Sequence, residues 1–322
     1  MFNRLALAAA MWLTATGMSV AAQDEAFPAR PVRLVVPSSP GGGLDFTARV
    51  VGTRLATKWQ QQVIVDNRAG AAGIIGTDIV AKATPGGYTL VLVSAEFTAM
   101  PFLYAKLPYG TADFAPITML SISPMLLAAH PTVAIKTFKE LLATAKEKPK
   151  QLTYASSGIG TTGHLAIMIL QKMAAVELVH VPFKGAGAAV AGAVAGETQL
   201  VTTSTGAGVP FIKAGRLRAI AVTSAKRAAV LPDTPTVAES GVPGYEVNVW
   251  FALLAPAKTP KAIINKIHAD VREVLKLPEL LAQFNTASME PGGMPPAEFE
   301  NILKAETKRM QTVIKEAGIR LD

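Results

Sequence analysis

Two turns rich in glycine and hydroxyl residues are the parts of this sequence best suited to chemistry. The first contains, in order, Ser38, Ser39, Pro40, Gly41, Gly42, Gly43 and, after one further residue, Asp45. Three consecutive glycines let a backbone approach a ligand closely and adopt positive φ, which a residue with a Cβ avoids. A helical pattern follows, and the free N–H groups of a helix N-terminus attract anions. The turn is a candidate anion site, although a tight turn in which Asp45 caps the helix would have the same sequence.

The second turn combines glycines with hydroxyl groups ahead of another helical pattern. It contains Ser156, Gly158, Gly160, Thr161 and, a little further on, His164. Hydroxyl groups donate to a carboxylate without adding a counter-charge. Four or five such bonds, each worth about 1.5–3 kcal/mol, would hold a small anion at about micromolar affinity after association costs. His164 either contacts the ligand directly or is a structural residue at the start of the helix.

A third run of hydroxyl and small residues extends from Thr202 to Gly208, after a predicted strand. Thr203 and Ser204 are its candidate ligand contacts. An ordinary surface loop is the alternative, and the run gains weight as a site only beside the other two turns.

Residues suited to catalysis are scarce. The chain has no Cys, which excludes a cysteine nucleophile, structural disulfides and Cys-ligated zinc. No Ser has Gly at both −2 and +2, so the nucleophile elbow of α/β-hydrolases is absent. His130, His164, His180 and His268 form neither a His-Glu-x-x-His motif nor another metal-ligand pattern. We therefore expect no enzyme activity, no cofactor and no metal site, with an exported hydrolase as the remaining enzymatic alternative.

The N-terminus resembles a secretory signal peptide. A positive start over residues 1–4 precedes a mainly apolar stretch over residues 5–20, and Val20-Ala21-Ala22 supplies the small residues of a cleavage site. The alternative is a membrane anchor, but a spanning helix needs about 17–25 apolar residues. We expect a signal peptide over residues 1–22, cleaved after Ala22, and an exported mature chain.

Composition and charge narrow the class of protein. The 322 residues are 50% hydrophobic and 17% charged, which is typical of a folded chain of about two domains rather than a disordered one. The formal charge of +8 could favour nucleic acid, but the cations are scattered and aromatic residues form only 6% of the chain. We expect no nucleic-acid binding. A positive field suits a protein that meets small anions, and it serves solubility equally well.

Strands alternate with helices along the chain. Apolar, β-branched runs predict strands over residues 32–36, 63–65, 89–93, 152–155, 179–182, 200–203, 217–223 and 247–255. Helical spacing predicts helices over residues 46–59, 73–83, 137–148, 186–195, 260–275 and 296–317, and another after residue 163. An apolar segment over residues 117–130, broken at Pro124, could pass between two domains. The pattern predicts parallel sheets covered on both faces, with ligands at the carboxyl ends of their strands.

Several sequence blocks together resemble one family. They are Pro40-Gly41-Gly42-Gly43-x-Asp45, Asp66-Asn67-Arg68-Ala69-Gly70-Ala71-x-Gly73, Gly87-Tyr88-Thr89-Leu90, Tyr154-Ala155-Ser156-x-Gly158-x-Gly160-Thr161 with His164-Leu165-Ala166, His180-Val181-Pro182-Phe183-Lys184-Gly185 and Leu231-Pro232-Asp233-Thr234-Pro235-Thr236-Val237-Ala238-Glu239. In this order they closely resemble the Bug family, the substrate-binding proteins of tripartite tricarboxylate transporters. The resemblance covers nearly the whole mature chain.

The resemblance implies an α/β, two-lobed periplasmic solute-binding protein of the type II (Venus-flytrap) class, each lobe a β-sheet flanked by helices. Lobe 1 would comprise residues 23–123 and 247–322, and lobe 2 residues 124–246, with hinges near Ser121–Pro124 and Glu246–Trp250. Such a receptor, expected to be a monomer, closes on a small carboxylate and delivers it to integral membrane transporter subunits. The ligand would be an aliphatic di- or tricarboxylate or an aromatic dicarboxylate. Presentation of the loaded receptor to a sensor kinase is an alternative.

Four positions depart from the usual pattern of the family. Thr203 stands where an aspartate is common, and Ala188, Gly192 and Met168 stand where proline, aspartate and glutamate are common. The last three suggest differences in packing. A missing carboxylate at Thr203, near the expected cleft, argues for a plain dicarboxylate rather than an amino acid.

Overall fold

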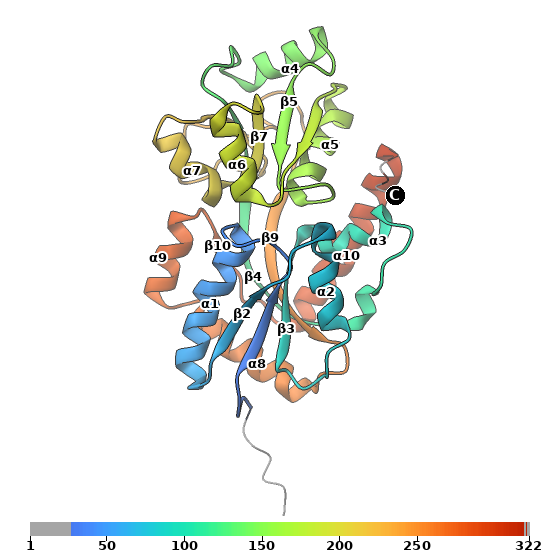
Figure 1. Cartoon of the computed structure of the whole chain (residues 1–322), viewed down its shortest axis with the longest axis vertical. Coiled ribbons are helices and arrows are strands. Elements are labelled where there is room, and N and C mark those ends of the chain that lie inside the picture. The colour runs from blue at the N-terminus through green and yellow to red at the C-terminus, as the bar shows by residue number, and fades with distance from the viewer. Residues whose placement is uncertain (1–26, 319, 321–322) are drawn as a thin grey trace, which may run out of the picture.

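The computed structural model describes residues 27–318 and 320, so the predicted signal peptide lies outside the described residues. The described chain forms two lobes, one above the other in Figure 1. Strands β4 (Phe114–Ala129) and β9 (Asn248–Pro256) run between them. The predicted two-lobed α/β fold is confirmed.

The first lobe, the lower one in Figure 1, is built on strands in the order β2-β1-β3-β9-β4. Strands β1, β2 and β3 are parallel, but β9 and β4 are antiparallel to their neighbours, so the sheet is mixed rather than parallel throughout. The lobe contains β1 (Val32–Val36), α1 (Gly43–Trp59), β2 (Val63–Asn67), α2 (Ile74–Ala81), β3 (Thr89–Ser94), α3 (Met100–Leu103), α8 (Lys261–Val274), α9 (Pro278–Thr286), β10 (Glu290–Pro291) and the start of α10 (Pro296–Ala317).

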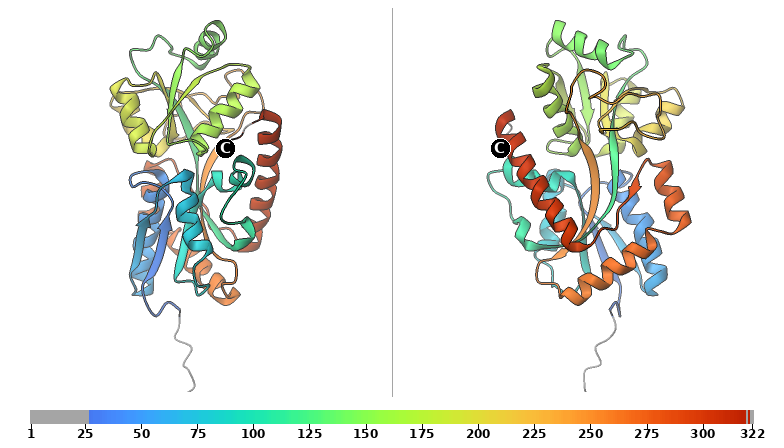
Figure 2. Two further views of the ribbon diagram at one scale, coloured as in Figure 1. Left: turned by 45° about the vertical axis from the view of Figure 1, so that its right-hand side comes forward. Right: turned by 180° about the vertical axis from the view of Figure 1, so that it is seen from behind.

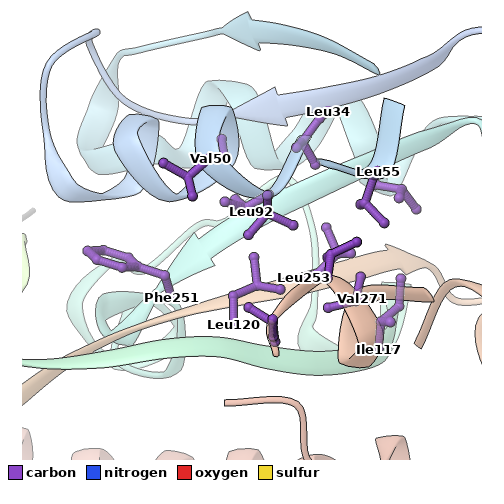
Figure 3. Close-up of a cluster of buried hydrophobic side chains, with 14 of the residues drawn as sticks. Leu34, Val50, Leu55, Leu92, Ile117, Leu120, Phe251, Leu253 and Val271 are labelled. Atoms are coloured by element: carbon purple, nitrogen blue, oxygen red, sulfur yellow. The ribbon is translucent and has the colours of Figure 1, made fainter. Parts of the chain in front are cut away.

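Both faces of this sheet are buried, which explains its continuous apolar strands. Leu34 and Val36 of β1 pack into one core cluster, and Val35 between them packs into another on the opposite face. This alternation follows from the period of two along a strand. Figure 3 shows part of the first cluster, which brings Leu34 and Leu92 of the sheet together with Leu55 of α1 and Val271 of α8. The two buried faces fix the strand ends that carry the turns.

The second lobe has the same plan. Strand β5 is parallel to β6 and β7, while β7 and β8 pair antiparallel with the far end of β4. The lobe contains α4 (Phe138–Glu147), β5 (Thr153–Ser156), α5 (Thr162–Ala174), β6 (Val179–Pro182), α6 (Ala186–Ala195), β7 (Leu200–Ser204), α7 (Thr205–Lys213) and β8 (Arg218–Val222). Helices α7 and α9 were not among the elements expected from the sequence.

Strand β4 is continuous through Pro124, and the predicted break there is wrong. Pro124 is the last residue of β4 that pairs with β9, and Met125 is the first that pairs with β7. Since proline lacks an N–H donor, it is tolerated where a strand changes partners. The proline therefore marks the passage of the chain from one lobe to the other.

Helix α10 lies along both lobes (Figure 2). Phe299 and Leu303 pack in the core of the first lobe, whereas Met310 and Ile314 pack with Leu165 of α5 in the second. Among the described residues, no helix is both long and apolar enough to span a membrane.

Candidate ligand-binding cleft

A cleft of about 650 Å³ lies between the two lobes. The loops at the carboxyl ends of β1, β2 and β3 line it from the first lobe, and those after β5, β6 and β7 line it from the second. Met125 of β4 and Val249 and Phe251 of β9 add apolar contacts. Of the residues predicted from the sequence, the lining includes Ser38, Ser39, Gly42, Gly43, Gly158, Thr161, Thr203 and Ser204.

The first turn is held in shape by its glycines and by Asp45. Gly41 has a φ of +87° and donates its N–H to Asp45 Oδ2 at 3.0 Å. A Cβ at Gly43 would lie 2.8 Å from the ring of Phe251, so only glycine fits there without a shift. Gly42 caps α1 without a side-chain hydrogen bond, which leaves the N-terminus of the helix without a side-chain cap at the cleft.

Asp45 does not line the cleft and is only 4% exposed. Its carboxylate accepts hydrogen bonds from Gly41, Arg49 and Asn67. Burial opposes ionisation, but the hydrogen bonds from these three residues lower the pKa of Asp45 below its ordinary value. The structure thus gives Asp45 a positioning role. Pro40 and Gly41, also predicted as ligand contacts, do not line the cleft either.

The second turn faces the cleft with Gly158 and Thr161, backed by residues that do not line it. Ser156 Oγ lies 2.7 Å from His180 Nε2 and also bonds Gly158. The Thr161 hydroxyl donates to the Gly158 carbonyl at 2.7 Å, so its proton is already engaged within the turn. Helix α5 begins here without a side-chain cap, and Thr161, Thr162 and Gly163 at its start line the cleft.

His164 lies behind this turn, 7% exposed, and does not line the cleft. Its Nδ1 accepts the N–H of Gly160, and its ring stacks on His180. Burial and then the neighbouring His180 lower the pKa of His164 to about 4, and burial lowers the pKa of His180 to about 4. Both rings are therefore neutral near pH 7 and support the turn, as the structural alternative for His164 proposed. Ser156 and Gly160 also position the turn from behind.

Unpartnered hydroxyl groups are the most informative feature of the cleft wall. The Oγ atoms of Ser38 and Ser204 and the Oγ1 atom of Thr203 are buried and have no hydrogen-bond partner among the described residues. All three residues line the cleft. Because an unsatisfied buried hydroxyl costs about 1–3 kcal/mol, such groups call for a polar occupant. The run from Thr202 to Gly208, for which a surface loop was the alternative, forms the end of β7 and the start of α7.

Several contributions to the cleft were missed at the sequence level. Residues 69–73 line it as a third loop, in which Ala71 and Ala72 have φ values of 45° and 51°. This loop belongs to the block from Asp66 to Gly73, one of those on which the family resemblance was based. That resemblance could have identified the loop as part of the site. Lys184 and Glu96 also line the cleft. Glu96 follows the carboxyl end of β3, so the rule for parallel strands could have found it.

The lobes touch at several points around the cleft. Thr162 Oγ1 of the second lobe donates to Glu96 Oε2 of the first at 2.5 Å. A Cβ at Gly185 would lie 3.3 Å from Cβ of Ser39, and one at Gly206 would lie 3.0 Å from the carbonyl oxygen of Ala287. Glycine at these positions lets the two lobes approach closely beside the cleft.

The other departures from the family pattern fall into two groups. Met168 packs against the cluster shared by α10 and α5, and a Cβ at Gly192 would meet the Phe183 ring at 2.5 Å, so their packing interpretation is confirmed. Ala188 is exposed on α6, and the packing interpretation is wrong for it. Within the described residues, no group of three His, Asp or Glu side chains could hold a metal ion.

Comparisons with known proteins agree with this geometry. Residues 47–319 match the sequence profile described as "Tripartite tricarboxylate transporter family receptor". Protein BugT of Bordetella pertussis is 31% identical over 99% of each chain. A solved structure titled "R. palustris Rpa4515 with adipate" is 34% identical with a TM-score of 0.88, covering 92% of this chain and 100% of the other. MatC from Rhodopseudomonas palustris "with bound malate" is 28% identical with a TM-score of 0.85, covering 89% and 100%.

The resemblance to the Bug family is confirmed by these matches. The chain therefore belongs to the tripartite tricarboxylate transporter receptor family, and it is a periplasmic-type solute-binding receptor rather than an enzyme.

Proposed function

We propose that this receptor binds a small carboxylate, in the simplest case a dicarboxylate, in the cleft between its lobes. The observation that carries the proposal is the set of three unpartnered hydroxyls at Ser38, Thr203 and Ser204. Two helix N-termini without side-chain caps, those of α1 and α5, lie beside them. Hydroxyl donors and free N–H groups together suit an anion. A volume of about 650 Å³ is within the range of small-molecule sites.

The two bound relatives support the ligand class. Their titles report adipate and malate, both dicarboxylates, in those proteins. The absence of a carboxylate at Thr203 does not exclude an amino acid, however, because Glu96 supplies a carboxylate to the cleft from the first lobe.

The proposed mechanism is closure of two lobes on the ligand and delivery to the integral membrane subunits of a tripartite transporter. We propose lobe boundaries at residues 23–123 and 247–322 for the first lobe and 124–246 for the second, supported by the change of strand partners at Pro124. An anion that contacts both lobes favours the closed form, because only differential binding shifts such an equilibrium. Export with cleavage after Ala22 remains part of the proposal.

The test is direct binding by purified mature protein. Native mass spectrometry would identify a co-purified acid, and calorimetry would then measure its affinity beside a panel of dicarboxylates. We expect a 1:1 complex and a rise in apparent melting temperature, since a ligand that binds only the folded state stabilises it. Stabilisation by uncharged solutes alone, with no response to any carboxylate, would contradict the proposal.

A further inference from the structure

The charged groups of the cleft are few and lie on different lobes. Within residues 27–318, the cleft wall contains one carboxylate, Glu96, and one cation, Lys184. A carboxylate is unexpected in the wall of an anion site, since it repels a bound anion. Its presence requires a specific explanation.

Glu96 is held in place by hydroxyl groups on both sides. Ser94 Oγ donates to its Oε1 at 2.5 Å from the same lobe, and Thr162 Oγ1 donates to its Oε2 at 2.5 Å from the other lobe. Each carboxylate oxygen has about two acceptor positions, so one on each remains for a ligand. An ionised carboxylate accepts hydrogen bonds and cannot donate them. The ligand atom that faces Glu96 must therefore be a donor.

The remaining polar groups of the cleft have the opposite character. Ser38, Thr203 and Ser204 offer unpartnered hydroxyls, and Lys184 offers a cation without an ion-pair partner among the described residues. These groups suit the carboxylates of a ligand. Among the described lining residues, Glu96 is thus the one carboxylate in a wall otherwise rich in hydroxyl donors, and it lies next to the N-terminus of α5.

We propose that Glu96 determines specificity by selecting a carboxylate ligand that bears a hydrogen-bond donor, a hydroxyl or an ammonium group, and by disfavouring a carboxylate in that place. The inference rests on the proposed function, because it concerns the same cleft. It names a narrower substrate class, that of hydroxy- or amino-substituted dicarboxylates.

The experiment uses three matched series of acids that differ in chain length. They are succinate, malate and aspartate; glutarate, 2-hydroxyglutarate and glutamate; and adipate, 2-hydroxyadipate and 2-aminoadipate. Calorimetry measures the affinity of each acid for the wild-type mature protein and for Glu96→Gln. The hydroxy and amino members of each series distinguish the two donors.

For at least one length, we expect wild-type protein to bind a substituted acid at least tenfold more tightly than the unsubstituted one. Glu96→Gln should lose at least tenfold in affinity for that substituted acid and should bind its unsubstituted parent at least as tightly as wild-type protein does, because a repelling charge is removed. Thr162→Val is the matched control, since it removes the interlobe hydrogen bond to Glu96 and keeps the Glu96 carboxylate. It should weaken all members of a series by similar factors.

Tighter binding of the unsubstituted acid at every length would overturn the inference, as would an equal loss for all members of a series in Glu96→Gln. If Glu96→Gln does not fold, Glu96→Asp keeps the charge and should retain part of the preference; an unchanged ranking with equal weakening would again overturn it. If wild-type protein binds none of the nine acids, this inference fails, whereas the proposed function fails only if the protein responds to no carboxylate at all.

Discussion

The imidazole ring of His164 stacks on that of His180 with ring centroids 4.1 Å apart. Tyr154 stacks on the other side of His180 at 4.9 Å. The three rings lie behind the second turn, where His164 fixes Gly160 and His180 contacts Ser156. The turn that faces the ligand is therefore supported by two imidazoles that must stay neutral.

This stack predicts loss of stability in mild acid. The pKa of each ring is about 4 in the folded protein and about 6.5 in the unfolded chain, so the unfolded chain binds protons first as pH falls. The contribution is fully present above pH 6.5 and is lost as pH falls through 4. Each ring can lower the free energy of unfolding by at most about 1.4 kcal/mol per pH unit between these values.

Calorimetric unfolding between pH 7.5 and 4.5 measures this effect. His180→Gln should flatten the pH dependence, and His130→Gln, at a histidine outside the stack, should leave it unchanged. Equal slopes in wild-type protein and His180→Gln would contradict the role of the stack.

Adjacent threonines of β7 allow a matched test of the unpartnered hydroxyls. Thr202 and Thr203 both have buried, unpartnered hydroxyls, but only Thr203 lines the cleft. Thr203→Val should weaken carboxylate binding by about 1–3 kcal/mol with little loss of stability, because no internal hydrogen bond is removed. Thr202→Val should leave affinity unchanged, which calorimetry with both variants would measure. Equal affinity losses in the two variants would remove Thr203 from the ligand contacts.

Closure can be tested at Gly206. A Cβ there would meet the carbonyl oxygen of Ala287 in the other lobe at 3.0 Å. Gly206→Ala should therefore disfavour the closed form and lower ligand affinity by about 1–3 kcal/mol, the usual cost of overpacking, while the free protein keeps its stability. Gly187→Ala is the control, since a Cβ at Gly187 would have no atom of the described residues within 4 Å outside its own helix backbone and chain neighbours.

Small-angle scattering of the Gly206 variant completes this test. At ligand concentrations that saturate Gly187→Ala, Gly206→Ala should keep a larger radius of gyration. Full compaction of both variants with equal affinity would show that this contact does not control closure.

Much of the fold could be predicted because its strands are buried on both faces. Continuous apolar runs such as Val32–Val36 leave few other interpretations. The interpretation of Pro124 as a break was wrong because a proline interrupts a strand only where a neighbouring strand needs its N–H as a hydrogen-bond donor. Helix α9 was missed because only Leu280 and Phe284 of this helix are buried, which gives a weak helical pattern of apolar residues.

The parts of the candidate site that are formed by glycine- and hydroxyl-rich turns could be predicted from the sequence. Side chains that reach the site from other segments were harder to predict. The glycines and hydroxyls near Ser38 and Ser204 were visible as local runs. Glu96 lies in a short 3-10 helix, Ala95–Thr98, without such a run, and only the fold brings it beside Thr162. His164 is close to the turn in sequence, but its direction away from the cleft depends on the stack with His180.

Helix α10 has a practical consequence for handling this protein. Because its first half is anchored to one lobe and Met310 and Ile314 pack beside Leu165 of the other, any hinge motion must rearrange packing close to the carboxyl terminus. An affinity tag or fluorescent fusion attached at that end would lie next to side-chain packing that changes when the lobes move. Labels intended to report opening without disturbing it belong on α4, at the far tip of the second lobe in Figure 1.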